Sequence, residues 1–451
     1  MKLHLLFTFA ITLSGVASLL FPVKTIARET SDPVRLRVDV DRGVLPADTA
    51  ETAVIKIGLD GIRPSRREWR PPVNIALVID RSGSMSGDKI VKAREAALEA
   101  VRRLSPDDIV ALVVYDTNVQ TLVPAQRVGD GRRLERAISG IEVGGNTALH
   151  GGVTRGAAEV RRHMEDRRFV NRVILLSDGL ANVGPSSPEE LGRLGASLVK
   201  EGISVTTIGL GLGFNEDLMT RLAQRSDGNT YFVEHSNDLS RIFAAELGDV
   251  LNVVARRIII EIEFPAGVRP MKFIGRDGII RGQRAEFSLN QLYGGQEKFA
   301  LVEVEVAPTK SGAEVEIARA KVSYEDPSTQ RTTTMSAQRS VQFSSSRTAV
   351  VASADHKVQA DYAANALAVA KDEAVTLVDS NRREEAAAVL RQRANELKVM
   401  GELYKNSAVS ALAAPAAPEA DRLEKEGLGN AERKIYRADS VQTRSQQASG
   451  R

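Results

Sequence analysis

Three short segments carry hydroxyl and carboxylate side chains at spacings that could hold a metal ion. Asp80-Arg81-Ser82-Gly83-Ser84 follows the apolar run Val73–Ile79, Ser177-Asp178-Gly179 follows the run Val173–Leu176, and Thr147 lies in a glycine-rich loop. Donors that are all oxygen select a hard cation, so we expect Mg²⁺, with Mn²⁺ or Ca²⁺ as alternatives. Asp-x-Ser-x-Ser alone would equally suit a polar turn that caps the next helix. The prediction therefore depends on the three segments together.

The sequence around these segments predicts an α/β fold that brings them to one place. Between Val73 and Leu251, continuous apolar runs such as Ile109–Tyr115 alternate with helical stretches such as Pro188–Lys200. This alternation is typical of a doubly wound, mostly parallel sheet that helices cover on both faces. Ligands of such sheets bind outside the carboxyl ends of the strands. Asp80 and Asp178 both follow predicted strands, so we expect all three segments to meet at this edge.

Together these residues resemble the von Willebrand factor type A (VWA) domain and its metal-ion-dependent adhesion site. The likeness covers about Asn74–Leu251, and the phrases Val78–Met85 and Leu175–Gly184 look like those of bacterial exported members of that family. The resemblance implies a Rossmann-like VWA domain over residues 73–252. The arrangement of the flanking segments is also similar to that of inter-alpha-trypsin inhibitor heavy chains and chloride-channel-regulator-like proteins.

The resemblance also implies a role for each site residue. In the family, Ser82, Ser84 and Thr147 would touch the metal, whereas Asp80 and Asp178 would act largely through waters. Neutral hydroxyls leave the charge of the ion poorly neutralised, so the ion still attracts an anionic oxygen. The implied partner is a protein that offers an Asp or Glu carboxylate, and the implied function is metal-dependent adhesion or protein binding.

The sequence on either side of the α/β region predicts an all-β domain. Apolar residues alternate with polar ones within residues 33–60 and again within 253–346, which is typical of half-buried strands. We expect both stretches to belong to one sandwich-like domain into which the α/β domain is inserted. Residues 28–72 then comprise an N-terminal β segment and a linker.

The C-terminal part predicts helices followed by an unstructured end. Residues 347–405 have the pattern of a helical hairpin with its break near Asn381-Arg382-Arg383. Residues 406–451 are rich in alanine, proline and polar residues, and we expect a linker and a disordered tail there.

The N-terminus predicts export. The apolar run Leu3–Val23, followed by Thr25-Ile26-Ala27, is typical of a secretory signal peptide over residues 1–27. An uncleaved membrane anchor is the alternative, because the run is long enough to span a bilayer. We expect a periplasmic, secreted or cell-surface protein that meets a membrane only if this segment is retained.

Composition excludes several functional classes. The 451 residues include no cysteine, which rules out disulfides, thiolate metal sites and cysteine nucleophiles. The formal net charge of +3 gives no electrostatic basis for binding nucleic acid. We expect no enzyme, because the motif segments hold no obvious general base and His150 is expected to be a helix-start residue. An accessory subunit of an envelope transporter or channel is the alternative function, followed by a metal-dependent hydrolase. The sequence leaves the oligomeric state and the partner open.

Overall fold

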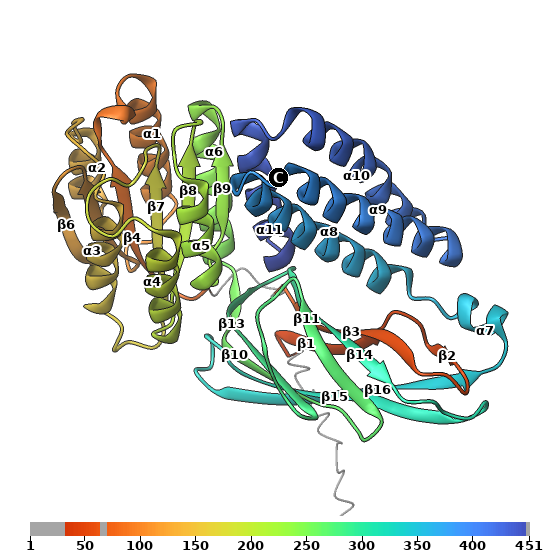
Figure 1. Ribbon diagram of the computed structural model, residues 1–451. Coiled ribbons are helices and arrows are strands. Elements are labelled where there is room, and N and C mark those ends of the chain that lie inside the picture. The colour runs from red at the N-terminus through yellow and green to blue at the C-terminus, as the bar shows by residue number, and fades with distance from the viewer. Residues whose placement is uncertain (1–31, 64–69, 448–451) are drawn as a thin grey trace, which may run out of the picture. The chain divides into compact units, whose positions relative to one another are not determined.

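A computed structural model describes residues 32–63 and 70–447 of the chain as three groups of elements (Figure 1). The predicted signal segment 1–27 lies outside the described residues. From Pro33 onward, the described residues belong to one compact unit. No helix among them is both long and apolar enough to cross a membrane.

The first group is a six-stranded sheet in the order β6-β5-β4-β7-β8-β9. Its strands are β4 (Val73–Asp80), β5 (Ile109–Tyr115), β6 (Val119–Arg127), β7 (Val170–Ser177), β8 (Ile203–Leu210) and β9 (Thr230–Val233). All neighbours pair in parallel except β6, which runs antiparallel to β5. Strands β4, β5 and β8 are buried along their whole length, which explains their continuous apolar runs. The predicted mostly parallel sheet is confirmed.

Helices cover both faces of this sheet (Figure 1). One face packs against α1 (Asp88–Arg102), α2 (Arg132–Ser139) and α6 (Leu239–Val250). The other face packs against α3 (Leu149–Arg161), α4 (Pro188–Lys200) and α5 (Glu216–Arg225). Short 3₁₀ turns, η1 (Gly83–Met85) and η2 (Ser236–Asp238), precede α1 and α6. Two separate apolar cores therefore hold the sheet rigid between the helices.

The second group consists of two sheets packed face to face. A four-stranded sheet has the order β1-β3-β14-β11, and a six-stranded sheet has the order β12-β13-β10-β15-β16-β2. Their strands are β1 (Val34–Val40), β2 (Val44–Pro46), β3 (Glu51–Gly61), β10 (Val253–Glu263), β11 (Val268–Ile274), β12 (Ile279–Arg281), β13 (Arg284–Tyr293), β14 (Glu297–Val306), β15 (Glu314–Glu325) and β16 (Thr332–Ser344).

Strands from before and after the α/β group pair within these sheets. β3 runs antiparallel to β14, and the short β2 runs parallel to β16. A single apolar core joins both sheets and includes Ile57, Ile260 and Val302. The prediction of an α/β domain inserted in a sandwich-like β domain is confirmed.

The third group is helical. The hairpin is formed by α8 (His356–Asp379) and α9 (Arg383–Tyr404), and the short α7 (Arg347–Ala352) precedes it. The two long helices meet at Asn381, whose φ of 61° lets the chain reverse.

The expected linker and disordered tail over residues 406–451 is wrong for most of that segment. It forms α10 (Ser407–Glu426) and α11 (Asn430–Ser445). In α10 the buried residues recur every three or four positions and face the hairpin: Val409, Ala413, Ala416, Ala420 and Leu423. Pro415 and Pro418 lie on the exposed face, so they do not interrupt this packing.

Charged contacts explain why the polar α11 is also folded. The Arg433 guanidinium lies 2.6 Å from carboxylate oxygens of both Asp217 and Asp379. The Lys434 ammonium donates to the main-chain oxygen of Phe214 at 2.6 Å. These partners lie on or beside α5 and at the end of α8, so tertiary contacts, rather than local apolar content, order this helix.

Candidate metal centre

Three loops converge at the carboxyl edge of the inserted sheet. Asp80 is the last residue of β4, and Asp178 follows the last residue of β7. Thr147 lies just before α3 and is held by Asn182, whose Oδ1 accepts the Thr147 N–H at 2.8 Å. Asn182 donates its own N–H to the Thr147 carbonyl at 3.1 Å. The loop after β7 is thereby tied to the loop before α3.

The loop after β4 is tied to the same place by main-chain hydrogen bonds. The Gly144 N–H donates to the Arg81 carbonyl at 2.6 Å, and the Gly83 N–H donates to the Gly145 carbonyl at 2.9 Å. Met85 within this loop is fully buried in the apolar core. The loop is therefore anchored on both sides, which fixes the serines that it carries.

The three hydroxyls gather around a single point. The Ser82 and Ser84 oxygens are 3.1 Å apart, and the Ser84 hydroxyl donates to Asp178 Oδ1 at 2.7 Å. A Cβ atom placed on Gly179 would lie 3.1 Å from the Thr147 hydroxyl oxygen, 3.2 Å from that of Ser84 and 3.7 Å from that of Ser82. The structure thus brings together the residues that the sequence motifs singled out.

Asp80 is held by the loop that it begins. Its Oδ1 accepts the Ser82 N–H at 2.8 Å, and its Oδ2 accepts the Ser177 hydroxyl at 2.6 Å. Burial raises the pKa of Asp80, although these hydrogen bonds from Ser177 and Ser82 oppose the rise. A buried carboxylate whose charge is unfavourable is a suitable neighbour for a cation.

The donor set fits a hard cation whose charge stays partly exposed. Asp80, Ser82, Thr147 and Asp178 are buried, whereas Ser84 is exposed, so the cluster opens to solvent at Ser84. Residues 32–63 and 70–447 contain no group of three or more His, Asp or Glu side chains arranged to hold a metal. Any ion here would depend on hydroxyls for most of its protein ligands, as the sequence motif implies.

Sequence reasoning missed Lys89, the second residue of α1. Its ammonium forms an ion pair with Asp178 Oδ2 and lies 3.3 Å from the Ser84 carbonyl oxygen. A lysine in a polar first turn is an ordinary surface residue, and only its position nine residues after Asp80 could have drawn attention to it. His150 lies in the first turn of α3, as expected, and burial lowers its pKa.

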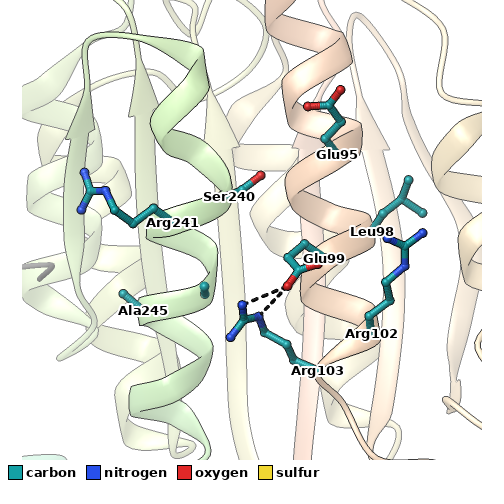
Figure 2. A pocket seen from close by; sticks show the side chains of 9 residues that line it. Glu95, Leu98, Glu99, Arg102, Arg103, Ser240, Arg241 and Ala245 are labelled. Atoms are coloured by element: carbon teal, nitrogen blue, oxygen red, sulfur yellow. Dashed lines mark hydrogen bonds and ion pairs between the residues drawn. The ribbon is translucent and has the colours of Figure 1, made fainter.

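A separate groove of about 710 Å³ lies between α1 and α6 (Figure 2). Its walls carry Glu95, Glu99, Arg103 and Arg241 around the apolar Leu98. The Arg103 guanidinium pairs with Glu99 at 2.9 Å on the same helix. Arg102 also lines the groove, so charges of both signs are present, with one more guanidinium than carboxylate.

Comparison with known proteins places the inserted domain in a family. The model of the von Willebrand factor type A domain matches residues 74–245. Domains of this family are generally interaction domains rather than enzymes, and they often use a metal.

The curated relatives support the same assignment. The chain is 26% identical to an uncharacterised protein of Synechocystis sp. over 59% of this chain and 65% of that one. It is 27% identical to the uncharacterised protein YfbK of Escherichia coli over 47% of this chain and 37% of that one. Inter-alpha-trypsin inhibitor heavy chain H3 of Rattus norvegicus is 28% identical over 43% of this chain and 22% of the relative. The chain therefore spans less than two thirds of the length of each.

Two solved structures share the fold over most of the chain. A von Willebrand factor type A protein from Catenulispora acidiphila has a TM-score of 0.65 at 17% identity, covering 88% of this chain and 97% of that one. The ArnB paralogue VWA2 from Sulfolobus acidocaldarius has a TM-score of 0.59 at 15% identity, covering 91% and 98%. Residues 74–245 of this chain thus match the von Willebrand factor type A family model, and the chain shares its fold with these two structures.

Proposed function

We propose that this chain is an exported protein of the periplasm or cell surface that binds a protein partner through a Mg²⁺ ion held at the carboxyl edge of the VWA sheet. The convergence of the Ser82, Ser84 and Thr147 hydroxyls beside two carboxylates is the observation that carries the proposal. The proposed export rests on the signal-like sequence of residues 1–27.

The hydroxyl and carboxylate residues of the site would hold the ion in different ways. The three hydroxyls supply neutral oxygen ligands, while Asp80 and Asp178 supply negative charge. Magnesium accepts such a set because it retains waters and an exchangeable position. When bound, the ion would offer a strong electrostatic contact to a carboxylate of the partner. The open side at Ser84 is where that carboxylate would approach.

Exposed apolar side chains around the cluster suit a protein partner. Leu180 is 59% exposed and follows Gly179, and Val143 is 37% exposed and precedes Gly144. Leu212 is 49% exposed, and its neighbour Gly213 lies against Asp178, since an added Cβ there would be 2.9 Å from the Asp178 carbonyl oxygen. Apolar surface beside a polar site is typical of an interaction surface. We therefore expect the partner carboxylate to be flanked by apolar side chains.

The experiment is crosslinking mass spectrometry in the native envelope, with Mg²⁺ and with EDTA. We compare the wild type with Asp80→Ala and Thr147→Ala. The matched control is Ser86→Ala, which removes an exposed hydroxyl of the same loop that donates to the Gly83 carbonyl. Specific crosslinks should vanish with EDTA and in the first two variants and persist in the control. A partner that remains bound to Thr147→Ala and in EDTA would refute the metal-bridged mechanism.

A further inference from the structure

Lys89 places a fixed positive charge against one of the two site carboxylates. Its ammonium pairs with Asp178 Oδ2, while Asp178 Oδ1 accepts the Ser84 hydroxyl at 2.7 Å. The Asp178 side chain is fully buried, and that of Lys89 is 35% exposed. The ion pair is therefore shielded from solvent on the carboxylate side, where a charge interaction is stronger than at an open surface.

Within residues 32–63 and 70–447, no ammonium or guanidinium group pairs with Asp80. Its two oxygens accept hydrogen bonds from the Ser82 N–H and the Ser177 hydroxyl, which are both neutral groups. The neighbouring Arg81 guanidinium pairs with Asp116 at 2.9 Å, so this pair adds no net charge beside the site. The two carboxylates and one ammonium therefore give the site a single net negative charge instead of two.

We propose that Lys89 sets the charge balance of the metal site, weakening the binding of a divalent cation while leaving more positive charge on the bound ion for a carboxylate ligand. With Lys89 present, a divalent ion retains about one net positive charge, whereas without it the two aspartates would neutralise the ion. Lys89 thus lowers the affinity of the site for the divalent cation and raises the affinity of the bound cation for a carboxylate ligand. The inference rests on the metal site of the proposed function.

A purely structural role for Lys89 predicts the opposite result. The ammonium also lies 3.3 Å from the Ser84 carbonyl oxygen, so it could simply hold the serine loop. Losing a structural support would loosen the serines and weaken metal binding. Losing a competing positive charge would strengthen metal binding. The sign of the change separates the two roles.

The test is calorimetric titration of the full chain with Mn²⁺, comparing the wild type with Lys89→Met and Lys89→Gln. Lys89→Arg keeps the charge, and Lys92→Met removes a lysine of the same helix that pairs with Glu95 at 2.8 Å. We expect Lys89→Met and Lys89→Gln to bind Mn²⁺ about tenfold more tightly. Lys92→Met should match the wild type, and Lys89→Arg should bind Mn²⁺ more weakly than Lys89→Met and Lys89→Gln because it keeps the positive charge. Circular dichroism checks that each variant is folded.

The second measurement uses acetate labelled with ¹³C at the carboxyl carbon. Its relaxation by protein-bound Mn²⁺ reports carboxylate binding to the metal. Lys89→Met should bind acetate at least about threefold more weakly than the wild type. Mn²⁺ affinity that is unchanged or lower in both folded variants would overturn the inference, and so would unchanged acetate binding. A wild type that binds no Mn²⁺ would instead overturn the proposed function itself.

Discussion

At the scale of single residues, the site is shaped as much by a missing side chain as by those present. Gly179 follows Asp178 and faces the three hydroxyls, and its backbone has no positive φ. Alanine could therefore adopt the same backbone conformation, but its Cβ would lie only 3.1 Å from the Thr147 hydroxyl oxygen. A methyl group at position 179 would therefore crowd the hydroxyl oxygens that the proposed function assigns to the ion.

We predict that Gly179→Ala lowers Mn²⁺ affinity about tenfold, equivalent to about 1.4 kcal/mol, because the methyl group crowds the hydroxyls. The free energy of unfolding should change by less than about 1 kcal/mol. Calorimetric titration and urea unfolding measure the two effects. Gly83→Ala is the matched control, since outside the adjoining residues the atoms nearest its Cβ would be the Gly144 and Gly145 carbonyl oxygens, at 3.6 and 3.8 Å. Equal Mn²⁺ affinity in both variants would contradict the prediction.

At the scale of elements, a buried ion pair and its hydrogen bonds fix α6 to the sheet. Glu246 is fully buried and pairs with the equally buried Arg172 of β7 at 3.0 Å. The second carboxylate oxygen of Glu246 accepts hydrogen bonds from the Asn229 amide at 2.8 Å and the Tyr231 hydroxyl at 3.1 Å. Sliding of α6 along the sheet would separate these groups without water to replace them.

We predict that Glu246→Gln lowers the free energy of unfolding by about 2–4 kcal/mol, because it leaves the buried Arg172 charge without its ion-pair partner. Asp238→Asn at the start of the same helix is the control. It breaks an ion pair with Arg241 in which both side chains are about half exposed, so it should cost less than about 1 kcal/mol. Urea denaturation of both variants checks the difference. Similar losses in the two variants would show that the buried pair does not fix α6.

The strands and helices differ in how clearly the sequence predicts them. Continuous apolar runs predicted the buried strands β4, β5, β7 and β8, because each is covered on both faces. β6 has no such signal, since Val123 is its only buried residue. The α10 stripe consists mostly of alanines, which look like a linker when prolines lie between them.

The residues of the metal site also differ in how far the sequence alone predicts them. The clustering of its five motif residues was predictable because two of the three segments follow predicted strands of a parallel sheet, whose carboxyl ends lie at one edge. Lys89 was not, because its importance comes only from the proximity of Asp178 in the folded chain.

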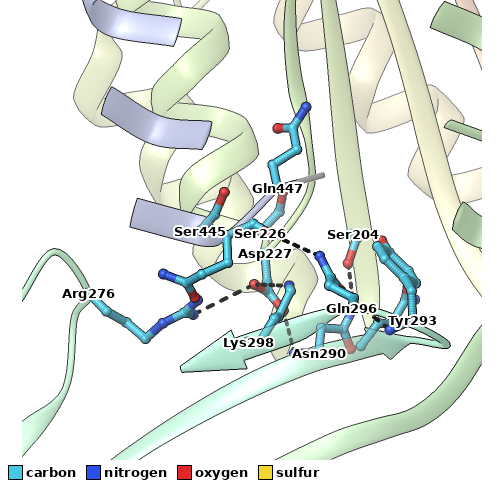
Figure 3. Close-up of polar contacts among 12 residues, drawn as sticks. Ser204, Ser226, Asp227, Arg276, Asn290, Tyr293, Gln296, Lys298, Ser445 and Gln447 are labelled. Atoms are coloured by element: carbon cyan, nitrogen blue, oxygen red, sulfur yellow. Dashed lines mark hydrogen bonds and ion pairs between the residues drawn. The ribbon is translucent and has the colours of Figure 1, made fainter. Parts of the chain in front are cut away.

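At the scale of the whole molecule, polar contacts join the three groups of elements (Figure 3). Asp227, between α5 and β9, accepts the Asn290 N–H of β13 at 2.6 Å and the Lys298 ammonium of β14 at 3.3 Å. Gln447, which follows α11, accepts the Thr230 N–H of β9 at 2.9 Å. Because Gln447 contacts the edge strand β9, residues predicted to be disordered instead contribute to the contacts between groups.

A second set of charges joins the helical hairpin to the β domain. Glu297 at the start of β14 lies 2.7 Å from the Lys357 ammonium of α8 and 2.6 Å from the Lys56 ammonium of β3. Burial disfavours the ionised form of Glu297, but hydrogen bonds from Lys357 and Lys56 outweigh it and lower the pKa to about 2. The Glu297 carboxyl therefore favours the folded state only while it is ionised.

This lowered pKa predicts an acid sensitivity. Above its ordinary pKa of 4.5, Glu297 is ionised in both the folded and the unfolded state, and its full contribution to the free energy of unfolding is present. Between pH 4.5 and 2 the unfolded chain takes up a proton that the folded chain resists, so stability falls with pH over that window. Because the Glu297 side chain is 23% exposed, we discount the shift and expect about 1–2 kcal/mol.

We therefore predict that Glu297→Gln has a free energy of unfolding about 1–2 kcal/mol lower than that of the wild type near pH 7. This difference between the two proteins should become smaller as the pH falls from 5 towards 3. Glu305→Gln is the control, because Glu305 lies on the same strand in an exposed pair with Arg269 at 2.8 Å. Urea unfolding at several pH values tests this. The control should follow the wild-type curve throughout, since an exposed pair contributes little. If instead the Glu297→Gln curve ran parallel to the wild type from pH 7 to 3, the hairpin would not be held on the β domain by this carboxylate.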